Sequence, residues 1–422
     1  MQNLFKHFSR TYIMLPLLQK IFETNLCDSC FGRQFGQMLS GYTNAERGKF
    51  LRQFSATAID ARQMQTEKIN PNNFLSFKFR QNEDFEKLPK EKKDCELCFG
   101  LFENLDKTAK RIANSLSKFE YTTFVIGTNL SRKLLDAEEK LWERCGIDYC
   151  EPTRAELNRE LGKRVEKLSG KKADLKKPDI AVLLDMENNK VFLNVNPLFI
   201  FGYYQKLQRG FPQCKWGTPD KYKTSVEEQV GLPALKLTLG IDHKFHGAGR
   251  EDIDARCLAW RPFVLEITKP RKRKIDLKKL EKIISRGKKV LVKGLKFSNM
   301  ETVREIKAAA VDKTYRALVV LKKSISQKDL KKLSGLKGTI SQRTPERVLH
   351  RRADLHRKRE VFSIKAKLKN KKTIELVIKG SAGLYIKELI SGDNGRTRPS
   401  VSEVLGTEAK CKELDVVGIG RI

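Results

Sequence analysis

The N-terminal half alternates between helical and strand-like patterns of apolar and polar positions. The predicted helices have helical apolar spacing or are highly charged, whereas the predicted strands are rich in β-branched and aromatic residues. Helices are expected at Leu105 to Phe119, Leu134 to Arg144 and Arg154 to Leu168, and strands at Phe74 to Phe79, Tyr121 to Gly127, Ile180 to Leu184, Val191 to Val195 and Leu198 to Tyr204. This order predicts an α/β region that closes at Tyr204.

The C-terminal half has more strand patterns than helical ones. The segment Gly210 to Lys223 is rich in glycine, proline and lysine, which indicates that it is itself the boundary between two domains. Strands are expected at Arg261 to Ile267, Val290 to Leu295, Tyr315 to Leu321, Phe362 to Leu368 and Thr373 to Ile378, and helices at Ser225 to Val230 and Leu277 to Ser285. This balance predicts an α+β domain built on a mixed sheet.

Length and composition are those of a folded globular protein. The 422 residues favour two or three domains, and 40% apolar with 32% charged residues argues against a disordered chain. No apolar run approaches the ~18–20 residues of a membrane helix. The stretch Tyr12 to Leu18 is short and contains Pro16, so it predicts a packed helix or loop, not a targeting segment.

The charge balance changes this picture. Lysine and arginine number 85 against 51 aspartates and glutamates, which leaves a net charge of +34. Such an excess favours a polyanionic partner, because each phosphate that is neutralised releases counterions. Two basic clusters, 269–274 and 343–360, support this, and arginine, which suits phosphates and bases, dominates the second. A solvated basic surface is the alternative.

Nine cysteines without a signal sequence indicate a reducing compartment, here the cytoplasm, and metal binding before disulfides. Cys27-x-x-Cys30 and Cys95-x-x-Cys98 are matched pairs, each followed by Phe-Gly. Each pair places two thiolates on one turn, and two such turns complete a closed tetrahedral zinc site. We therefore expect one structural Zn²⁺ at these four cysteines.

Other interpretations of the cysteines are weaker but open. The 64 residues between the pairs exceed the spacing of an ordinary zinc ribbon, so the intervening loop must contain structure of its own. Four unconnected core cysteines, or a redox dithiol, are alternatives. Cys145 and Cys150 form a rival pair whose spacing suits a zinc knuckle less well.

A carboxylate cluster, Gly249-Arg250-Glu251-Asp252-Ile253-Asp254, follows a Gly-x-Gly turn. A carboxylate there could be a nucleophile, a general base, a Mg²⁺ ligand or a loop-capping group. Three further segments favour a catalytic role. They are Lys313 to Ala317 at the start of a strand, Gly383 to Ile390 at the start of a helix, and the polar loop Ser391 to Thr397.

These segments resemble the three catalytic motifs shared by pseudouridine synthases: Asp after Gly-Arg-x, a tyrosine that opens a later strand, and a basic residue after Gly-x-Tyr-Ile. The wider match looks like the tenth family of these enzymes, which occurs in archaea and eukaryotes. It rests on Gly249 to Arg256, Arg261-Pro262-Phe263, Gln342 to Arg352, Gly383 to Arg396, the paired CxxC motifs and Leu414-Asp415-Val416. Leu258-Ala259-Trp260 replaces the glycine-rich approach to Arg-Pro-Phe that is usual in the family.

The resemblance implies roles for individual residues. Asp252 would be the catalytic aspartate, with Asp254 as its rival. Tyr315 would stack on the flipped uracil and could assist proton removal from C5. Lys387 would pair with Asp252, and Tyr385 would shape the base pocket. Asp252 has to be ionised, whether as nucleophile or as base; a core tyrosine at 315 and a solvated lysine at 387 are the alternatives.

Residues from about 60 to 205 resemble a THUMP-type RNA-binding domain. The match rests on Phe124-x-x-Gly127, Leu157-Asn158-x-Glu160-Leu161-Gly162-Lys163, Pro178-Asp179-Ile180 and Gly202-x-Tyr204-x-Lys206-Leu207. The resemblance implies contact with the acceptor or T arm of tRNA; a generic α/β accessory domain is the alternative. We expect RNA contacts from Arg250, Arg343, Arg347, His350, Arg351, Arg352, Arg396 and Lys206.

The expected organisation is a zinc-knuckle region at 1–55 and 85–105, a THUMP-like domain at 56–205, a linker at 206–224 and a pseudouridine synthase domain at 225–422. The implied reaction is isomerisation of uridine at positions 54 and 55 in the T loop of tRNA. No organic cofactor, membrane or obligatory protein partner is expected, and a monomer is favoured.

Two other activities fit part of the sequence. A THUMP-bearing RNA methyltransferase would need a glycine-rich cofactor loop, and a thiouridine synthetase an ATP-pyrophosphatase loop; neither is found, although Asn196-Pro197-Leu198-Phe199 faintly resembles an amino-methylating motif. A non-catalytic tRNA-binding factor would leave the conjunction of Asp252, Tyr315 and Lys387 unexplained.

Overall fold

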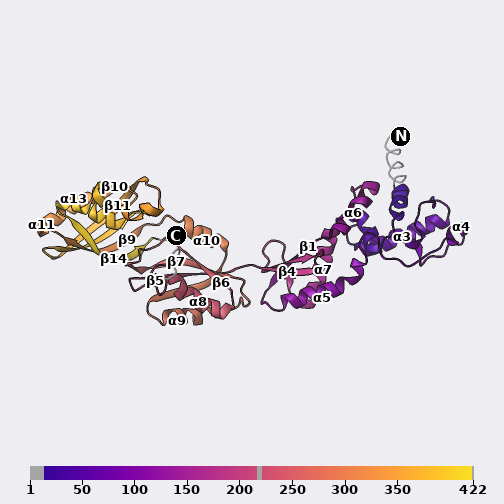
Figure 1. Cartoon of the computed structure of the whole chain (residues 1–422), viewed down its shortest axis with the longest axis horizontal. Helices are drawn as coiled ribbons and strands as arrows, with labels where there is room; N and C mark the ends of the chain where they lie inside the picture. The colour runs from indigo at the N-terminus through magenta and orange to yellow at the C-terminus, as the bar shows by residue number, and fades with distance from the viewer. Residues whose placement is uncertain (1–13, 216–220, 421–422) are drawn as a thin grey trace. The chain divides into compact units, whose positions relative to one another are not determined.

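The computed structural model describes residues 14–215 and 221–420. The chain divides into two compact units, Met1–Asn196 and Pro197–Ile422 (Figure 1). Among the described residues, none of the helices combines the length and the apolar character needed to span a bilayer.

The division lies earlier than the linker predicted at 206–224. Strand β5 (Leu198–Lys206) pairs with β7 (Ala255–Thr268) and β8 (Val290–Ser298), so it belongs to the C-terminal sheet. The prediction that it closes the N-terminal α/β region is therefore wrong. An apolar pattern identifies a strand but not its partners, and so the sequence places the boundary too late.

Short helices enclose an aromatic core in the first hundred residues. Phe22, Phe31, Phe74 and Phe85 are at most 1% exposed, and the Phe22 ring centroid lies 4.6 Å from Phe31 and 4.8 Å from Phe74. The elements are α2 (Asp28–Gly32), η1 (Arg33–Phe35), α3 (Asn44–Asp60), η2 (Pro71–Phe74), α4 (Glu83–Glu86) and η3 (Leu101–Asn104). The predicted strand from Phe74 to Phe79 is wrong, because both rings turn into this core instead of alternating across a sheet.

A four-stranded sheet, in the order β2-β1-β3-β4, forms the rest of this unit. Its strands are β1 (Thr123–Asn129), β2 (Lys172–Ala173), β3 (Ile180–Asp185) and β4 (Lys190–Val195), and its helices are α5 (Leu105–Leu116), α6 (Arg132–Cys145) and α7 (Thr153–Ser169). Phe124 and Ile126 of β1 pack against Ile112, Leu157 and Leu161 of the helices. The helices and strands predicted between 105 and 195 are confirmed.

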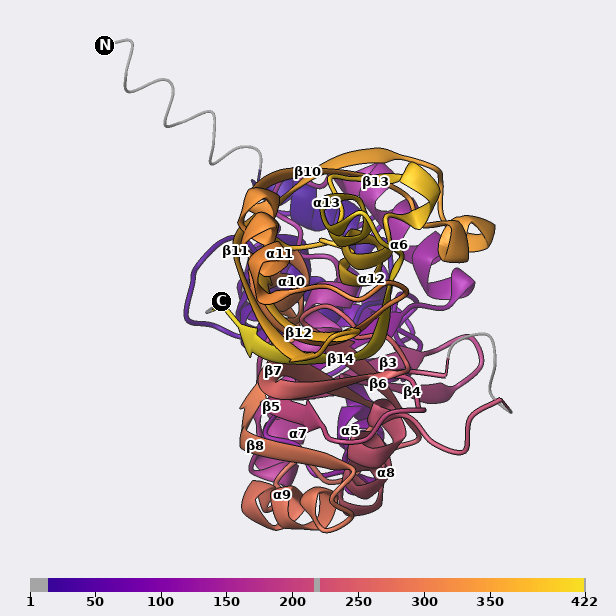
Figure 2. The same cartoon turned by 90° about the vertical axis from the view of Figure 1, so that its left-hand side faces the viewer.

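The second unit is built on a ten-stranded sheet in the order β13-β10-β11-β12-β9-β14-β7-β5-β8, with β6 also paired to β7. The neighbouring strands β7, β5 and β8 can be followed in Figure 2. The remaining strands are β6 (Asp242–Gly247), β9 (Lys313–Leu321), β10 (Gly338–Arg343), β11 (His356–Asn370), β12 (Thr373–Gly380), β13 (Thr397–Arg398) and β14 (Ala409–Ile419). β14 runs parallel to β7 and antiparallel to β9, so the sheet is mixed, as predicted.

Helices cover this sheet in two groups. One group packs Val230 and Leu280 against Ile200 and Phe263 of the sheet, and the other group packs Leu389 against sheet residues such as Val319. The helices are α8 (Val226–Thr238), α9 (Leu277–Ser285), α10 (Met300–Ala308), α11 (Gln327–Leu330), η4 (Lys331–Leu336), η5 (Glu346–Arg351), α12 (Ile386–Ser391), η6 (Asp393–Gly395) and α13 (Val401–Leu405).

Strand order brings three distant segments together. The loop 248–254 leads into β7, Tyr315 is the third residue of β9, and α12 begins directly after Tyr385. Because β14 lies between β7 and β9, the loop and Tyr315 are separated by one strand only. Ile386 and Leu389 of α12 pack in the same core cluster as Leu414 of β14, which places the helix start beside them.

Candidate active site

A cleft of about 890 Å³ opens in the C-terminal unit where these segments meet. Asp252, Tyr315, Tyr385 and Lys387, the four predicted catalytic residues, all line it, whereas Asp254 is not among the lining residues. Its basic lining side chains are Lys221, Arg250, Arg261, Lys313, Arg347, His350, Arg352, Arg357, Arg359 and Lys387. Only Glu251 and Asp252 contribute carboxylates among the described lining residues, so the cleft is suited to an anionic ligand.

Asp252 lies between two cations. Arg347 Nη2 and Lys387 Nζ are each 3.3 Å from Asp252 Oδ2, and the Asp252 side chain is 34% exposed. Gly249, at the start of the loop, has φ +81°, and a Cβ there would lie 3.1 Å from Arg261 Nη1. Glycine therefore allows the tight turn that brings Asp252 into the cleft.

Lys387 pairs with both carboxylates of the loop. Its Nζ lies 2.7 Å from each oxygen of Asp254, closer than to Asp252, and the Asp254 side chain is 69% exposed. Burial by itself would raise the pKa of Asp254, but the hydrogen bond and charge of Lys387 outweigh it and hold that pKa below its ordinary value. The expected Lys387–Asp252 pair is thus present but shared with Asp254.

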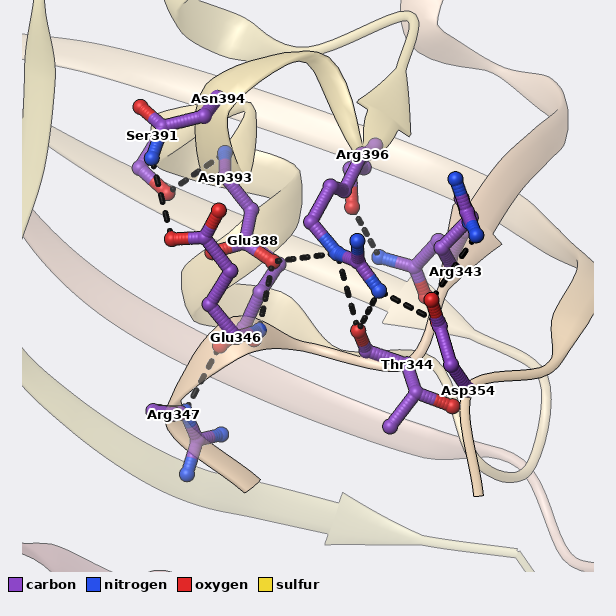
Figure 3. Close-up of polar contacts among 12 residues, drawn as sticks. Arg343, Thr344, Glu346, Arg347, Asp354, Glu388, Ser391, Asp393, Asn394 and Arg396 are labelled. Atoms are coloured by element: carbon purple, nitrogen blue, oxygen red, sulfur yellow. Dashed lines mark hydrogen bonds and ion pairs between the residues drawn. The ribbon is translucent and has the colours of Figure 1, made fainter. Parts of the chain in front are cut away.

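Arg347 is held by a buried carboxylate that sequence reasoning missed. Arg347 Nε donates to Glu388 Oε1 at 2.7 Å, and the Glu388 side chain is 5% exposed (Figure 3). Burial would lower the pKa of Arg347, but Glu388 and Asp252 raise it above its ordinary value. Glu388 follows Lys387 on α12, but its position beside a predicted catalytic lysine does not identify Arg347 as its partner.

Arg343 and Arg396 brace the loop that carries Arg347. Arg396 donates from Nε and Nη2 to Thr344 O at 3.1 and 2.8 Å and also pairs with Asp354, and Arg343 pairs with Asp354 at 2.8 Å (Figure 3). The Arg396 side chain is 16% exposed and that of Arg343 is 52% exposed. Arg396 is therefore committed to the loop, which leaves little of it for the RNA contact expected from the sequence.

The two tyrosines of the cleft have different environments. Tyr315 is partly buried, and burial together with the charge of Asp252 raises its pKa to about 12, against an opposing effect of Arg261. Tyr385 exchanges backbone hydrogen bonds with the Gln342 side chain, 3.0 Å in each direction, and its hydroxyl accepts from Arg352 Nη1 at 2.9 Å. Gln342 is 1% exposed and fixes the turn before α12, a role that the sequence did not predict.

The other residues predicted to bind RNA differ in position. Arg250, His350 and Arg352 are exposed and line the cleft. Arg351 ends η5, and its side chain lies outside the described part of the structure. Lys206 is 0% exposed, and its Nζ donates to two backbone carbonyls of the Asp252 loop. The prediction that Lys206 binds RNA is therefore wrong, because strand alternation turns this lysine into the core.

Three buried polar side chains, of Tyr204, Glu251 and Arg261, connect the Asp252 loop to the sheet. Arg261 Nη2 lies 3.3 Å from Glu251 Oε2, and these side chains are 1% and 0% exposed. The Tyr204 hydroxyl donates to the same oxygen at 3.0 Å. A buried ion pair is maintained only with further hydrogen bonds, which Tyr204 supplies here. Sequence reasoning gave none of these side chains a role.

The four predicted zinc ligands come together in the N-terminal unit. The Sγ atoms of Cys27, Cys30, Cys95 and Cys98 all lie within 4.8 Å of one another. Cys27 Sγ and Cys98 Sγ are 3.7 Å apart, close to the ~3.8 Å between thiolates that share a Zn²⁺ at ~2.3 Å. Three of the four cysteines are buried. The group can therefore hold a metal ion such as zinc.

The rival pair is not part of this group. Cys150 Sγ donates to Gln34 Oε1 at 3.3 Å, and neither Cys145 nor Cys150 is in the described cluster of possible metal ligands. Burial raises the pKa of the Cys150 thiol to about 11, as expected of an inert core cysteine.

Comparison with known proteins decides the family. The C-terminal model of the Pus10 family matches residues 199–420, and the model of the archaeal Pus10 THUMP domain matches residues 108–185. The chain belongs to the Pus10 family. The match to the THUMP model begins later and ends earlier than the THUMP-like domain expected at 56–205.

Curated Pus10 relatives match the chain over almost its whole length. The proteins from Methanothrix thermoacetophila, Methanocaldococcus jannaschii and Pyrococcus furiosus, each named tRNA pseudouridine synthase Pus10, are 38%, 39% and 39% identical. The alignments cover 94%, 93% and 94% of this chain and 92%, 92% and 95% of those relatives. Among solved structures, a Cbf5–Nop10–Gar1 complex is similar at a TM-score of 0.32 and 17% identity, over 52% of this chain and 49% of that one.

This Pus10 chain is a tRNA pseudouridine synthase, an isomerase, with a THUMP domain and an N-terminal four-cysteine cluster. The family resemblance read from the sequence is confirmed, as is the α+β fold class. Family membership decides against the methyltransferase and the non-catalytic tRNA-binding factor.

Proposed function

We propose that this Pus10 enzyme isomerises uridine at positions 54 and 55 in the T loop of tRNA, with Asp252 as the catalytic carboxylate. The observation that carries the assignment is the position of Asp252, which lines an open basic cleft between Arg347 and Lys387. Asp254, its rival, is more exposed and lies outside the set of lining residues.

The chemistry needs an ionised carboxylate and no external reagent. The C1′–N1 bond of uridine breaks, a C5–C1′ bond forms, and the proton on C5 is replaced by one on N1, so atoms and electrons balance. Asp252 acts on the ribose as nucleophile or as base, and in both routes Arg347 and Lys387 stabilise its charged form. We therefore expect no organic cofactor.

Tyr315 and Tyr385 shape the base pocket in this proposal. A uridine has to leave its stack to reach Asp252, and an aromatic ring offers it a new stacking surface. Because its pKa is about 12, Tyr315 acts as a neutral hydroxyl at physiological pH. Arg250, His350 and Arg352 on the rim are suited to the phosphates on either side of the flipped nucleotide.

In this proposal, the N-terminal unit binds tRNA. One Zn²⁺ at Cys27, Cys30, Cys95 and Cys98 would hold two chain segments together as a closed structural site, and the THUMP domain would contact the T arm or acceptor arm of tRNA. Recognition of tRNA by a domain of the same chain favours a monomer, and free cysteines favour a reducing compartment such as the cytoplasm.

The test is to map pseudouridine in an unmodified tRNA transcript by carbodiimide treatment and primer extension. Wild-type enzyme is expected to give stops one nucleotide 3′ of positions 54 and 55, and transcripts with cytidine at either position identify each stop. Asp252→Ala should give neither stop. Stops elsewhere would overturn the site of modification, full activity of Asp252→Ala would overturn the catalytic assignment, and a requirement for S-adenosylmethionine or ATP would overturn the reaction class.

A further inference from the structure

The segment after β5 supports the catalytic loop. Gly210 N–H donates to Ile253 O at 2.9 Å, and Gln213 Nε2 donates to Gly249 O at 3.0 Å. Both donors lie in the stretch that the sequence predicted to be an interdomain linker. The loop that presents Asp252 is therefore held by residues about forty positions upstream, as well as by its own turn.

Lys206 is the charged member of this support. Its Nζ lies 3.2 Å from Asp252 O and 3.0 Å from Ile253 O, and it lies 5.1 Å from the centroid of the Phe211 ring. The residue is 0% exposed. Among the described residues, no carboxylate lies within ion-pair distance of its ammonium, so the two carbonyls and the ring are its direct contacts. Burial lowers the pKa of Lys206, and the nearby charges of Glu251 and Asp254 oppose this effect.

A buried ammonium lowers the stability of the fold more than an apolar side chain of similar size would. Burying an ammonium removes its hydration, and carbonyl oxygens compensate for this only in part. Methionine would fill a similar space without a charge. A buried lysine is favoured here if the two carbonyls have to be held in fixed directions.

The direction of these carbonyls determines where Asp252 points. Each peptide unit is planar, so fixing Asp252 O fixes the plane between Asp252 and Ile253, and fixing Ile253 O fixes the next plane. The two planes set the backbone torsions of this turn, and with them the direction of the Asp252 side chain. The backbone supplies one hydrogen bond to each carbonyl, from Ala255 N–H to Asp252 O at 3.0 Å and from Gly210 N–H to Ile253 O at 2.9 Å. Lys206 Nζ bonds to both carbonyls and so ties the two peptide planes to each other.

We propose that Lys206 is a positioning residue of the reaction, whose buried ammonium holds the carbonyls of Asp252 and Ile253 and so keeps the Asp252 carboxylate between Arg347 and Lys387. The inference rests on the proposed catalytic role of Asp252. It assigns the lysine to catalysis through the loop, not to RNA, because no part of Lys206 reaches the surface.

The experiment compares full-length wild type with Lys206→Met and Lys206→Arg, with Lys215→Met as the control. Lys215 is also largely buried, at 20% side-chain exposure, but pairs with Glu228 at 2.9 Å and does not line the cleft. Three quantities are measured for each: the single-turnover rate of pseudouridine formation at saturating unmodified tRNA, the Kd for tRNA at fixed salt, and the melting temperature.

Lys206→Met is expected to lower the single-turnover rate roughly 10- to 100-fold, the scale of a misplaced catalytic group, with a Kd within about twofold of wild type. Lys206→Arg should recover part of the rate, because guanidinium also donates to carbonyls, and Lys215→Met should match wild type. A folded Lys206→Met with the wild-type rate would overturn the proposal. So would a loss that appears in Kd and vanishes at saturating tRNA.

Two further variants keep the outcomes distinct. If Lys206→Met does not fold, Lys206→Gln replaces it; its nitrogen falls one bond short of the lysine position, so a wild-type rate would overturn the proposal and a reduced rate at unchanged Kd would support it. Asp252→Asn runs in the same assay. A wild-type rate in Asp252→Asn defeats the proposed function itself, whereas an inactive Asp252→Asn beside a fully active Lys206→Met defeats only the role of Lys206.

Discussion

The four-cysteine cluster of the N-terminal unit and the Asp252 cluster of the C-terminal unit are both built from groups with strong mutual charge effects, but they differ in exposure. Three of the four cysteines are buried and all four turn inward on one another. Around Asp252, the side chains of Arg347, Lys387 and Asp252 itself are 39%, 23% and 34% exposed and line an open cleft.

This difference in exposure indicates that the cysteine cluster stabilises the fold, whereas the Asp252 cluster is accessible to a substrate. The four thiolates face one another and are not accessible to a substrate. The free energy of metal binding at this cluster would therefore contribute to folding of the unit and not to a reaction. The carboxylate and its cations retain access to solvent and to a ligand, which is what a reaction requires. Substitutions in the first cluster should therefore change stability, and those in the second should change rate.

The largest effect is expected from Asp252→Asn. If Asp252 is the catalytic carboxylate, as proposed, its loss should lower the single-turnover rate by at least about a thousandfold, with an unchanged Kd for tRNA and little change in melting temperature. Asp254→Asn is the matched control and should lose about tenfold or less, because it contacts Asp252 only through Lys387. If Asp254→Asn proves the more damaging of the two, the choice of carboxylate is reversed.

Cys95→Ser should have the next largest effect, on stability. Structural zinc sites bind with about 10–16 kcal/mol in isolated fingers, so loss of one thiolate should remove the metal and lower the melting temperature of the N-terminal unit substantially. Metal analysis should give one zinc per wild-type chain and none in the variant. Cys150→Ser, a buried thiol outside the cluster, should retain it. A zinc-free variant with normal stability but a reduced single-turnover rate would contradict the assignment of the cysteine cluster to folding.

Glu388→Gln should have a smaller effect on rate. The amide is a weaker acceptor than the carboxylate, so Arg347 is less firmly held beside Asp252, and we expect a loss of about tenfold at saturating tRNA. Glu346→Gln is the control, because Glu346 is exposed and its Oε2 accepts from Asn394 Nδ2 of η6 at 3.0 Å, and its carboxylate has no described ion pair with Arg347. Equal rates in the two variants would remove Glu388 from the site.

The smallest effect concerns pH. Burial raises the pKa of Tyr315 to about 12, so its hydroxyl stays almost fully protonated up to about pH 10. Tyr315→Phe is expected to lower the rate but to follow the same pH dependence as wild type between about pH 6 and 10. A basic limb that is present in wild type and absent in Tyr315→Phe would show that the tyrosine titrates in this range.

Local chemistry explains which parts of these sites the sequence predicted. A CxxC motif determines the separation of its two thiolates within one turn, so only the meeting of two turns remained to be predicted. The Asp252, Tyr315 and Lys387 motifs were found through family resemblance, and the structure brings all three to one cleft. Their roles in catalysis stay predictions.

The supporting residues could not be predicted, because their partners are defined only by the fold. Lys206 lies in a motif that resembles part of an RNA-binding THUMP domain. Strand β5 nevertheless belongs to the sheet of the C-terminal unit, where this lysine side chain is buried. Gln342 and Glu388 act on the backbone of Tyr385 and on the side chain of Arg347, both more than forty positions away along the chain. Spacing along a sequence carries no information about such pairs.

The position of β14 has a consequence for biosynthesis. This strand joins β7 to β9 in the sheet, although it is the last of the described strands in chain order and is synthesised after both of them. Until residues 409–419 emerge, the facing edges of β7 and β9 have no partner, and unpaired edges invite association with other chains. A nascent chain stalled before residue 409 therefore has the Asp252 loop and Tyr315 on two separate half-sheets, and the cleft cannot assemble until β14 has been synthesised.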